Sequence, residues 1–238
     1  MLAQVQAILG HGLIGLYLDG SIALGEFEAD RSDIDFVAVT DADVSHETFR
    51  ALAAFHAQLA ADSPRWGLEL EGSYVAATSI RHHDVRPGAH PYIDRGTGRL
   101  EIVRPENGYW VIHRHVLREH GVVLAGPTPQ TLIDAVNPGE LRRAVVDLLR
   151  EWWAPMLADA SRLQHWGYRC YAVLTMCRIL YSVDHGTVVS KRRAASWVRT
   201  VDPRWMGVIA AALAWSPATP PDLPDTLALI RHTVEGAT

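Results

Sequence analysis

The sequence has 238 residues, which is enough for one large domain or two small ones. Hydrophobic residues make up 48% of it and charged residues 21%, an ordinary globular balance that argues against disorder. The formal net charge of −5 provides no overall basic field that would attract nucleic acid non-specifically, so a cationic substrate suits this chain better.

The chain shows no signal for a membrane or for secretion. No apolar run approaches the 18 or so residues that span a bilayer, and the N-terminus lacks a basic start and a cleavage site. Cys170 and Cys177 lie in an apolar stretch where a helix would separate them by about two turns, roughly 10 Å. Because that distance is too long for a disulfide, we expect buried thiols in a cytoplasmic protein.

The front half of the chain predicts helices and strands in alternation. Helical spacing of apolar residues marks the helices, and compact or alternating apolar runs mark the strands. In chain order we expect a helix over 2–13, a strand over 13–18, a short helix over 22–27, a strand over 34–39, a helix over 46–61, a strand over 68–76, a loop over 82–99, a helix over 109–119 and a connection over 122–129.

The back half of the chain predicts helices almost throughout. They are expected over 141–157, 162–183, 194–201 and 224–234, with short breaks between them. Pro138-Gly139 is the best boundary between the two halves. We therefore predict a mixed α/β domain over 1–138 and an all-helical domain over 139–238.

Two acidic residues stand at the start of the strand predicted over 34–39. Asp33 and Asp35 project from the same face of a strand, with Cα atoms roughly 6–7 Å apart. Both carboxylates can therefore converge on one Mg²⁺ or on a pair, and hard oxygen ligands suit this ion. The apolar residues that follow lead into the core, so we expect the acids at the exposed end of a buried strand.

A glycine-serine turn follows the first predicted strand. Gly20 permits a close approach that a side chain would block, and Ser21 adds a hydroxyl to the free backbone N–H groups at a helix start. Such a turn binds triphosphate oxygens, while a metal ion polarises the α-phosphate for in-line attack. Each pattern alone is common, but the succession strand, Gly-Ser, helix, Asp-Ile-Asp, strand is far more specific.

A third carboxylate is expected from the strand over 68–76. Glu69 and Glu71 lie two residues apart and would share one face of it. Either of them can act as general base for a substrate hydroxyl or complete the metal site. The alternative is a polar strand face that is exposed to solvent.

These residues resemble the nucleotidyltransferase superfamily, whose pattern is Gly-Ser, a spacer, then a serine or threonine before Asp-x-Asp. Here the pattern reads Gly20-Ser21 and then Ser32-Asp33-Ile34-Asp35. Leu174-Thr175-Met176-Cys177-Arg178-Ile179-Leu180-Tyr181, followed by Asp184-His185-Gly186 and Ser190-Lys191, is similar to the aminoglycoside adenylyltransferases that act on streptomycin and spectinomycin.

The resemblance implies a fold and an activity. The fold is a polymerase-beta-like nucleotidyltransferase domain with a mixed sheet, followed by an all-α helical bundle. The activity is the magnesium-dependent transfer of AMP from ATP to a hydroxyl of an aminoglycoside-type antibiotic, with release of pyrophosphate, by a monomer without nucleic-acid or membrane partners.

The resemblance also implies a role for each matching residue. Metal ligands would be Asp33, Asp35 and Glu71, with Glu71 also the catalytic base, and the nucleotide-binding residues would be Gly20, Ser21, Ser32, Arg178 and Lys191. Arg178 and Lys191 would reach back from the helical domain to the triphosphate, where a fixed cation favours departure of pyrophosphate.

The chain departs from the family where the family binds its acceptor. The family holds the cationic drug with a serine and an acid of the helical domain, but the corresponding segment here reads His165-Trp166-Gly167-Tyr168 and contains no matching acid. The loop predicted over 82–99 also differs in composition, with His82, His83, Asp84 and His90.

Other functions fit parts of the pattern. A nucleotidyltransferase acting on RNA or protein, of the toxin-associated kind, would share the acids, and Arg178 with His185 has a spacing seen in helical RNases. A non-catalytic nucleotide binder is a further alternative, against which the intact acids argue.

Two further sets of side chains can be interpreted either as structural residues or as ligand-binding residues. A zinc module would use His82-His83-Asp84 or His113 and His115, although positions i and i+2 of a helix face different ways. Four tryptophans can either pack in the core or form an aromatic wall that stacks on a base or a sugar ring. They are Trp110, Trp152, Trp153 and Trp166.

Overall fold

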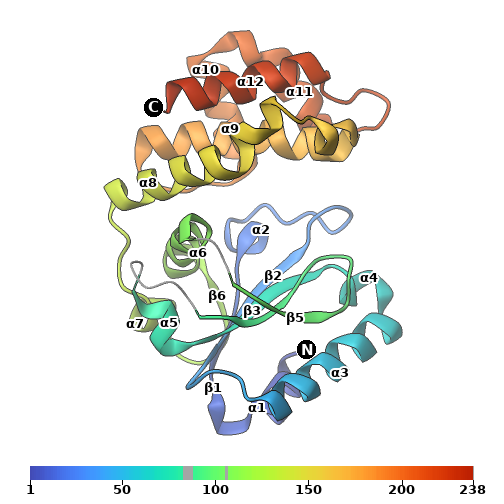
Figure 1. The fold of residues 1–238 in the computed structure, drawn as a ribbon, viewed down its shortest axis with the longest axis vertical. Helices are drawn as coiled ribbons and strands as arrows, with labels where there is room; N and C mark the ends of the chain where they lie inside the picture. Colours follow the sequence, from blue (N-terminus) through green and yellow to red (C-terminus); the bar gives the residue numbers. More distant parts are fainter. Residues whose placement is uncertain (83–87, 105–106, 238) are drawn as a thin grey trace. The chain divides into compact units, whose positions relative to one another are not determined.

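The computed structural model describes residues 1–82, 88–104 and 107–237, and it divides into two compact units, Met1–Val136 and Asn137–Thr238 (Figure 1). The first unit combines a mixed sheet with helices, and the second is helical. The fold class predicted from the sequence is therefore confirmed.

The sheet of the first unit has six strands. They are β1 (Leu13–Leu18), β2 (Ile34–Thr40), β3 (Leu70–Ala76), β4 (His90–Ile93), β5 (Leu100–Val103) and β6 (Val122–Ala125). Their spatial order is β5-β4-β3-β2-β1-β6. β2 and β3 pair in parallel, while the other neighbours pair antiparallel, so the sheet is mixed.

Helices cover both faces of this sheet. α1 (Leu2–Leu9) and α3 (His46–Asp62) pack on one face, and α6 (Asn107–His120) packs on the other (Figure 1). Shorter helices of this unit are α2 (Gly20–Ala23), α4 (Pro64–Gly67), α5 (Ala77–Arg81) and α7 (Pro129–Leu132).

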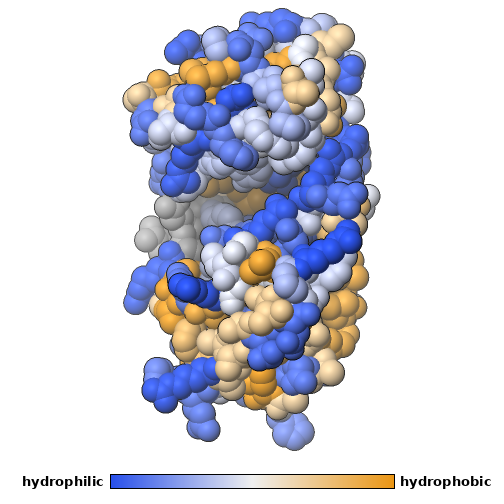
Figure 2. Space-filling view, turned by 90° about the vertical axis from the view of Figure 1, so that its right-hand side faces the viewer, coloured by the Kyte–Doolittle hydropathy of each residue, from blue (hydrophilic) through white to orange (hydrophobic). Residues whose placement is uncertain are grey.

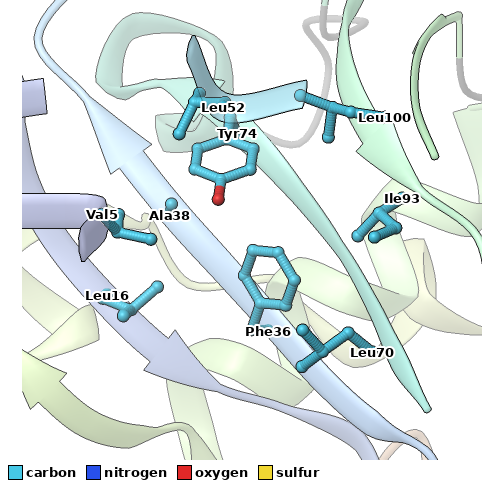
Figure 3. Packing of buried hydrophobic residues seen from close by; sticks show 9 residues of the cluster. All are labelled: Val5, Leu16, Phe36, Ala38, Leu52, Leu70, Tyr74, Ile93 and Leu100. Atoms are coloured by element: carbon cyan, nitrogen blue, oxygen red, sulfur yellow. The ribbon is translucent and has the colours of Figure 1, made fainter. Parts of the chain in front are cut away.

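Alternation along β2 divides the core into two layers. Phe36 and Ala38 point toward α1 and α3, in a cluster that also contains Tyr74 of β3 (Figure 3). Val37 and Val39 point to the opposite face and pack with α6. Since side chains of a strand alternate between faces, Asp35 continues the α6 side of β2.

The second unit is built around one long buried helix. Its helices are α8 (Pro138–Leu148), α9 (Trp166–His185), α10 (Lys191–Val201), α11 (Met206–Ala214) and α12 (Leu223–Gly236), with shorter helical turns at 149–153, 154–157 and 161–164. α9 contributes Cys170 and Cys177, which are buried free thiols as predicted. Gly186 caps the end of α9, and its φ of 67° suits a residue without a side chain.

A reciprocal cap begins α8. The Asn137 side chain accepts a hydrogen bond from the Glu140 N–H (3.0 Å), and the Glu140 carboxylate accepts one from the Asn137 N–H (3.2 Å). Pro138 occupies the first helical turn, where its missing N–H costs nothing. These residues explain why a new helix starts where the second unit begins.

Two connections predicted from the sequence were wrong. The expected loop over 82–99 contains β4, which pairs with β3, and the expected connection over 122–129 contains β6, which pairs with β1. The apolar side chains of β6 are largely exposed, so it lacks the half-buried alternation that identifies a strand. The start of β4, His90-Pro91, is also hard to recognise from the sequence, because proline is uncommon within a strand.

Several boundaries also needed correction. The helix expected over 2–13 ends at Leu9 and gives way to a 3₁₀ turn, Gly10–Gly12. The helix expected over 22–27 is α2, which runs from Gly20 to Ala23. The strand expected over 68–76 begins at Leu70, and α11 was not predicted.

Hydrophilic and hydrophobic residues are mixed over the face of the chain drawn in Figure 2. Among the helices of the described residues, none is long and apolar enough to cross a membrane.

Candidate functional site

Strand direction brings distant acidic residues to one end of the sheet. β1 runs antiparallel to β2, with Leu18 opposite Phe36, so Asp19 at the end of β1 lies beside the start of β2. β3 runs parallel to β2, with Glu71 opposite Asp35. Asp19, Asp35 and Glu71 therefore meet at the end of the sheet where strands β2 and β3 begin.

Three carboxylates form the centre of the site. Asp33, Asp35 and Glu71 each offer an oxygen, and these oxygens lie within 4.8 Å of one another. Among the described residues, no other cluster of histidine, cysteine, aspartate or glutamate side chains is placed to share a metal ion. Three carboxylates are a hard oxygen donor set, so the residues fit Mg²⁺.

The carboxylates repel one another in the absence of a cation. Burial raises the pKa of Asp35 to about 7, and the charges of Asp33, Glu71 and Asp19 contribute to the rise. Burial also raises the pKa of Glu71, against a hydrogen bond from the Tyr92 hydroxyl to Glu71 Oε1 (2.7 Å). A divalent cation would relieve this repulsion and favour the ionised carboxylates.

Gly20 is required by the position of Asp35. A Cβ atom at Gly20 would lie 1.8 Å from Asp35 Oδ2, and the φ of this glycine is +58°. Ser21 follows it, and its buried Oγ has no hydrogen-bond partner among the described residues. A buried hydroxyl without a partner is unfavourable, so this atom is suited to donate to a ligand oxygen.

The other predicted residues of the first unit have protein partners. Ser32 Oγ accepts a hydrogen bond from the Glu28 N–H (3.0 Å), so it holds the turn before β2. Glu69 precedes β3 and forms an ion pair with Arg95 (Nη2 to Oε2, 2.5 Å). Of the two glutamates left open by the sequence, Glu71 is the one that the fold places with the aspartates.

Arg178 and Lys191 lie in the second unit. Arg178 is half-buried on α9, and Lys191 is the first residue of α10. Lys191 Nζ lies 4.3 Å from the centroid of the Tyr171 ring. The ring holds this side chain by a cation–π contact, and the predicted contact of both residues with a triphosphate stays a prediction.

Sequence reasoning missed a second ion pair at the site. Asp19 is only 2% exposed, and its Oδ2 accepts a hydrogen bond from His113 Nδ1 of α6 at 3.0 Å. Both residues line a pocket that also contains Asp35, Glu71 and Tyr92. The available signal was an aspartate at the end of an apolar strand, since a buried acid needs a partner.

The histidines that suggested zinc have other partners. His113 is bound to Asp19, and His82 is paired with Asp134 (2.6 Å). His115 is buried on α6, while His83 and Asp84 lie outside the described residues. Within the part of the chain that the structure describes, no group of these histidines is placed to share a metal ion.

The tryptophans and the histidine of the RNase-like spacing either pack against other side chains or are exposed. Trp110 and Trp153 are buried in the core, whereas Trp152 is exposed. His185 is stacked on the ring of Tyr181, with centroids 3.9 Å apart.

Two comparisons with known proteins found a match, one by sequence and one by fold. Residues 131–224 match the aminoglycoside adenylyltransferase C-terminal domain family. The structure resembles that of spectinomycin adenyltransferase AAD(9) from Enterococcus faecialis, solved with ATP and spectinomycin, with a TM-score of 0.69 and 15% identity over 99% of this chain and 96% of that one. No curated protein matches the sequence. The chain thus resembles the aminoglycoside adenylyltransferases, by sequence over residues 131–224 and by fold over nearly its whole length.

Proposed function

We propose that the protein transfers AMP from ATP to a hydroxyl group of an aminoglycoside-type acceptor and releases pyrophosphate. The observation that carries this proposal is the convergence of Asp33, Asp35 and Glu71 within 4.8 Å beside the Gly20-Ser21 turn. The match of residues 131–224 to the aminoglycoside adenylyltransferase family supports the choice of acceptor.

Asp33, Asp35 and Glu71 would hold Mg²⁺. When bound, this ion neutralises charge on the triphosphate and polarises the α-phosphate. Asp35 and Glu71 have raised pKa values, so ion binding is expected to be linked to proton release near neutral pH.

The chemical step then needs a base and a positioned hydroxyl. The acceptor oxygen attacks the α-phosphorus, the bond from this phosphorus to the bridging oxygen of the β-phosphate breaks, and pyrophosphate leaves with the bonding electrons. Glu71 takes the hydroxyl proton as general base, and the cation favours the ionised form of Glu71 that this role needs. Tyr92 fixes the orientation of Glu71 by its hydrogen bond.

The triphosphate is bound, in this proposal, by Gly20, Ser21 and Ser32 of the first unit and by Arg178 and Lys191 of the second. The unpartnered hydroxyl of Ser21 supports its role. Arg178 and Lys191 lie within the segment that matches the family. The net charge of −5 is consistent with a cationic acceptor.

A pyrophosphate-release assay with ATP, Mg²⁺ and a panel of aminoglycosides tests the proposal. We expect release with at least one drug, and loss of that release in Asp33→Asn while its melting curve shows a folded protein. Asp30→Asn is the matched control, because Asp30 lies in the same loop but its side chain is 98% exposed and outside the carboxylate group.

Two results would contradict the proposal. Release with short RNAs but with no drug would assign the chain to the RNA-modifying nucleotidyltransferases instead. Full turnover in Asp33→Asn would remove this carboxylate from the catalytic centre.

A further inference from the structure

The pair formed by Asp19 and His113 has no part in the mechanism above, although it lines the same pocket as Asp35 and Glu71. Asp19 ends β1, and His113 lies on α6, 94 residues later in the chain. A buried carboxylate and an imidazole are therefore held together at the centre of the proposed active site.

The orientation of the His113 ring is determined on two sides. Asp19 is an acceptor, so Nδ1 carries the proton that it donates to Oδ2 (3.0 Å). Tyr109 lies against the ring with centroids 4.1 Å apart. The other ring nitrogen, Nε2, makes no hydrogen bond to a described residue, and the side chain is 29% exposed.

The surroundings of His113 favour its charged form. Burial by itself lowers its pKa, but the hydrogen bond from Nδ1 to the buried Asp19 carboxylate, and the charge of that carboxylate, raise the pKa above the ordinary histidine value of 6.5. A charged imidazolium donates at both nitrogens. Nε2–H is therefore a donor for an anion and not a base for a hydroxyl.

We propose that Asp19 orients His113 so that its Nε2–H binds a non-bridging oxygen of the nucleotide triphosphate. His113 is then a substrate-binding residue and Asp19 a positioning residue, and this inference rests on the function proposed above. His113 supplies a charge-assisted hydrogen-bond donor from within the first unit, in the same pocket as Asp35 and Glu71.

Binding of α,β-methylene ATP, measured by calorimetry with Mg²⁺, tests the role directly and needs no turnover. In His113→Asn the shorter amide can still donate to Asp19 but offers nothing at the Nε2 position. We expect its affinity for the analogue to fall about tenfold to a hundredfold, the effect of one charge-assisted hydrogen bond. Its affinity for adenosine should stay unchanged.

Four further variants make the test specific. His113→Gln, whose longer amide reaches the Nε2 position, should recover part of the affinity. Asp19→Asn should weaken binding, and combining it with His113→Asn should add little, because the two residues act as one unit. His120→Asn is the matched control, since His120 is an exposed residue at the end of the same helix.

The outcomes separate this inference from the proposed function. If His113→Asn binds the analogue as tightly as the wild type does, the triphosphate contact is refuted while the proposed function stands. Equal losses for the analogue and for adenosine, or a loss of turnover with unchanged binding, would also overturn it. A wild-type protein that binds no nucleoside triphosphate would overturn both.

Discussion

Gly20→Ala tests two reasons why a glycine is needed at this position. The first reason is conformational, because Gly20 has a φ of +58°. The second is steric, because the added Cβ would lie 1.8 Å from Asp35 Oδ2. Because Gly20→Ala changes both the backbone strain and the steric contact, it needs a control variant that changes the backbone strain alone.

The expected magnitudes differ between stability and activity. A left-handed conformation costs an alanine about 1–2 kcal/mol, which lowers the free energy of unfolding by that amount. Ordinary van der Waals contact begins at 3.4 Å, so the Asp35 carboxylate must move by about 1.5 Å. Because a shift of about 1 Å in a reacting group costs about a hundredfold in rate, we expect at least that loss in turnover.

Gly25→Ala is the matched control. Gly25 has a φ of +72°, but nothing lies within 4 Å of its added Cβ. Urea unfolding should therefore show a similar loss of stability for both variants, while pyrophosphate release should fall steeply in Gly20→Ala alone. Turnover of Gly20→Ala within a few-fold of the control would refute the argument that this glycine makes room for the Asp35 carboxylate.

Three further changes test other parts of the structure. Lys191→Ala should raise the KM for ATP with little change in stability, and an unchanged KM would remove this residue from the site. Tyr92→Phe deletes the hydrogen bond that lowers the pKa of Glu71, so the acidic limb of the pH–rate profile should move to higher pH. Burial, with a smaller effect of the N-terminal amino group, lowers the pKa of His56 from 6.5 to about 4. Since the unfolded chain then binds more protons than the folded chain, the contribution of His56 is fully present above about pH 6.5. About 3 kcal/mol of it is lost as the pH falls to 4, and urea unfolding of His56→Phe should lack this component.

The parts of the site predicted from the sequence are those that local geometry determines. Asp33 and Asp35 share a face because a strand has a period of two residues. Gly20 and Ser21 could be placed because they follow Asp19 at the end of an apolar strand, which the structure confirms over Leu13–Leu18. Neither inference needs to know which strands are neighbours.

The parts that escaped prediction depend on pairing between distant segments. β4 and β6 are strands because β3 and β1 offer them backbone partners, and their own side-chain patterns are weak. The pair Asp19–His113 joins residues 94 positions apart, on elements that meet only when α6 packs on the sheet. A single sequence does not indicate which distant residue is the partner of Asp19.

Backbone contacts hold the end of β1 beside the start of β2, where Asp35 lies. The Asp19 N–H donates to the Asp35 carbonyl (3.0 Å), and the absence of a side chain at Gly20 leaves room for the Asp35 carboxylate. Arg95 lies 3.9 Å from Asp33, too far for a strong ion pair. Burial, with added repulsion from Asp33, Glu71 and Asp19, therefore keeps the pKa of Asp35 raised in the folded chain, although His113 partly offsets the rise. Such a preorganised acidic centre lowers the stability of the cation-free protein, and the same repulsion strengthens the binding of a divalent cation.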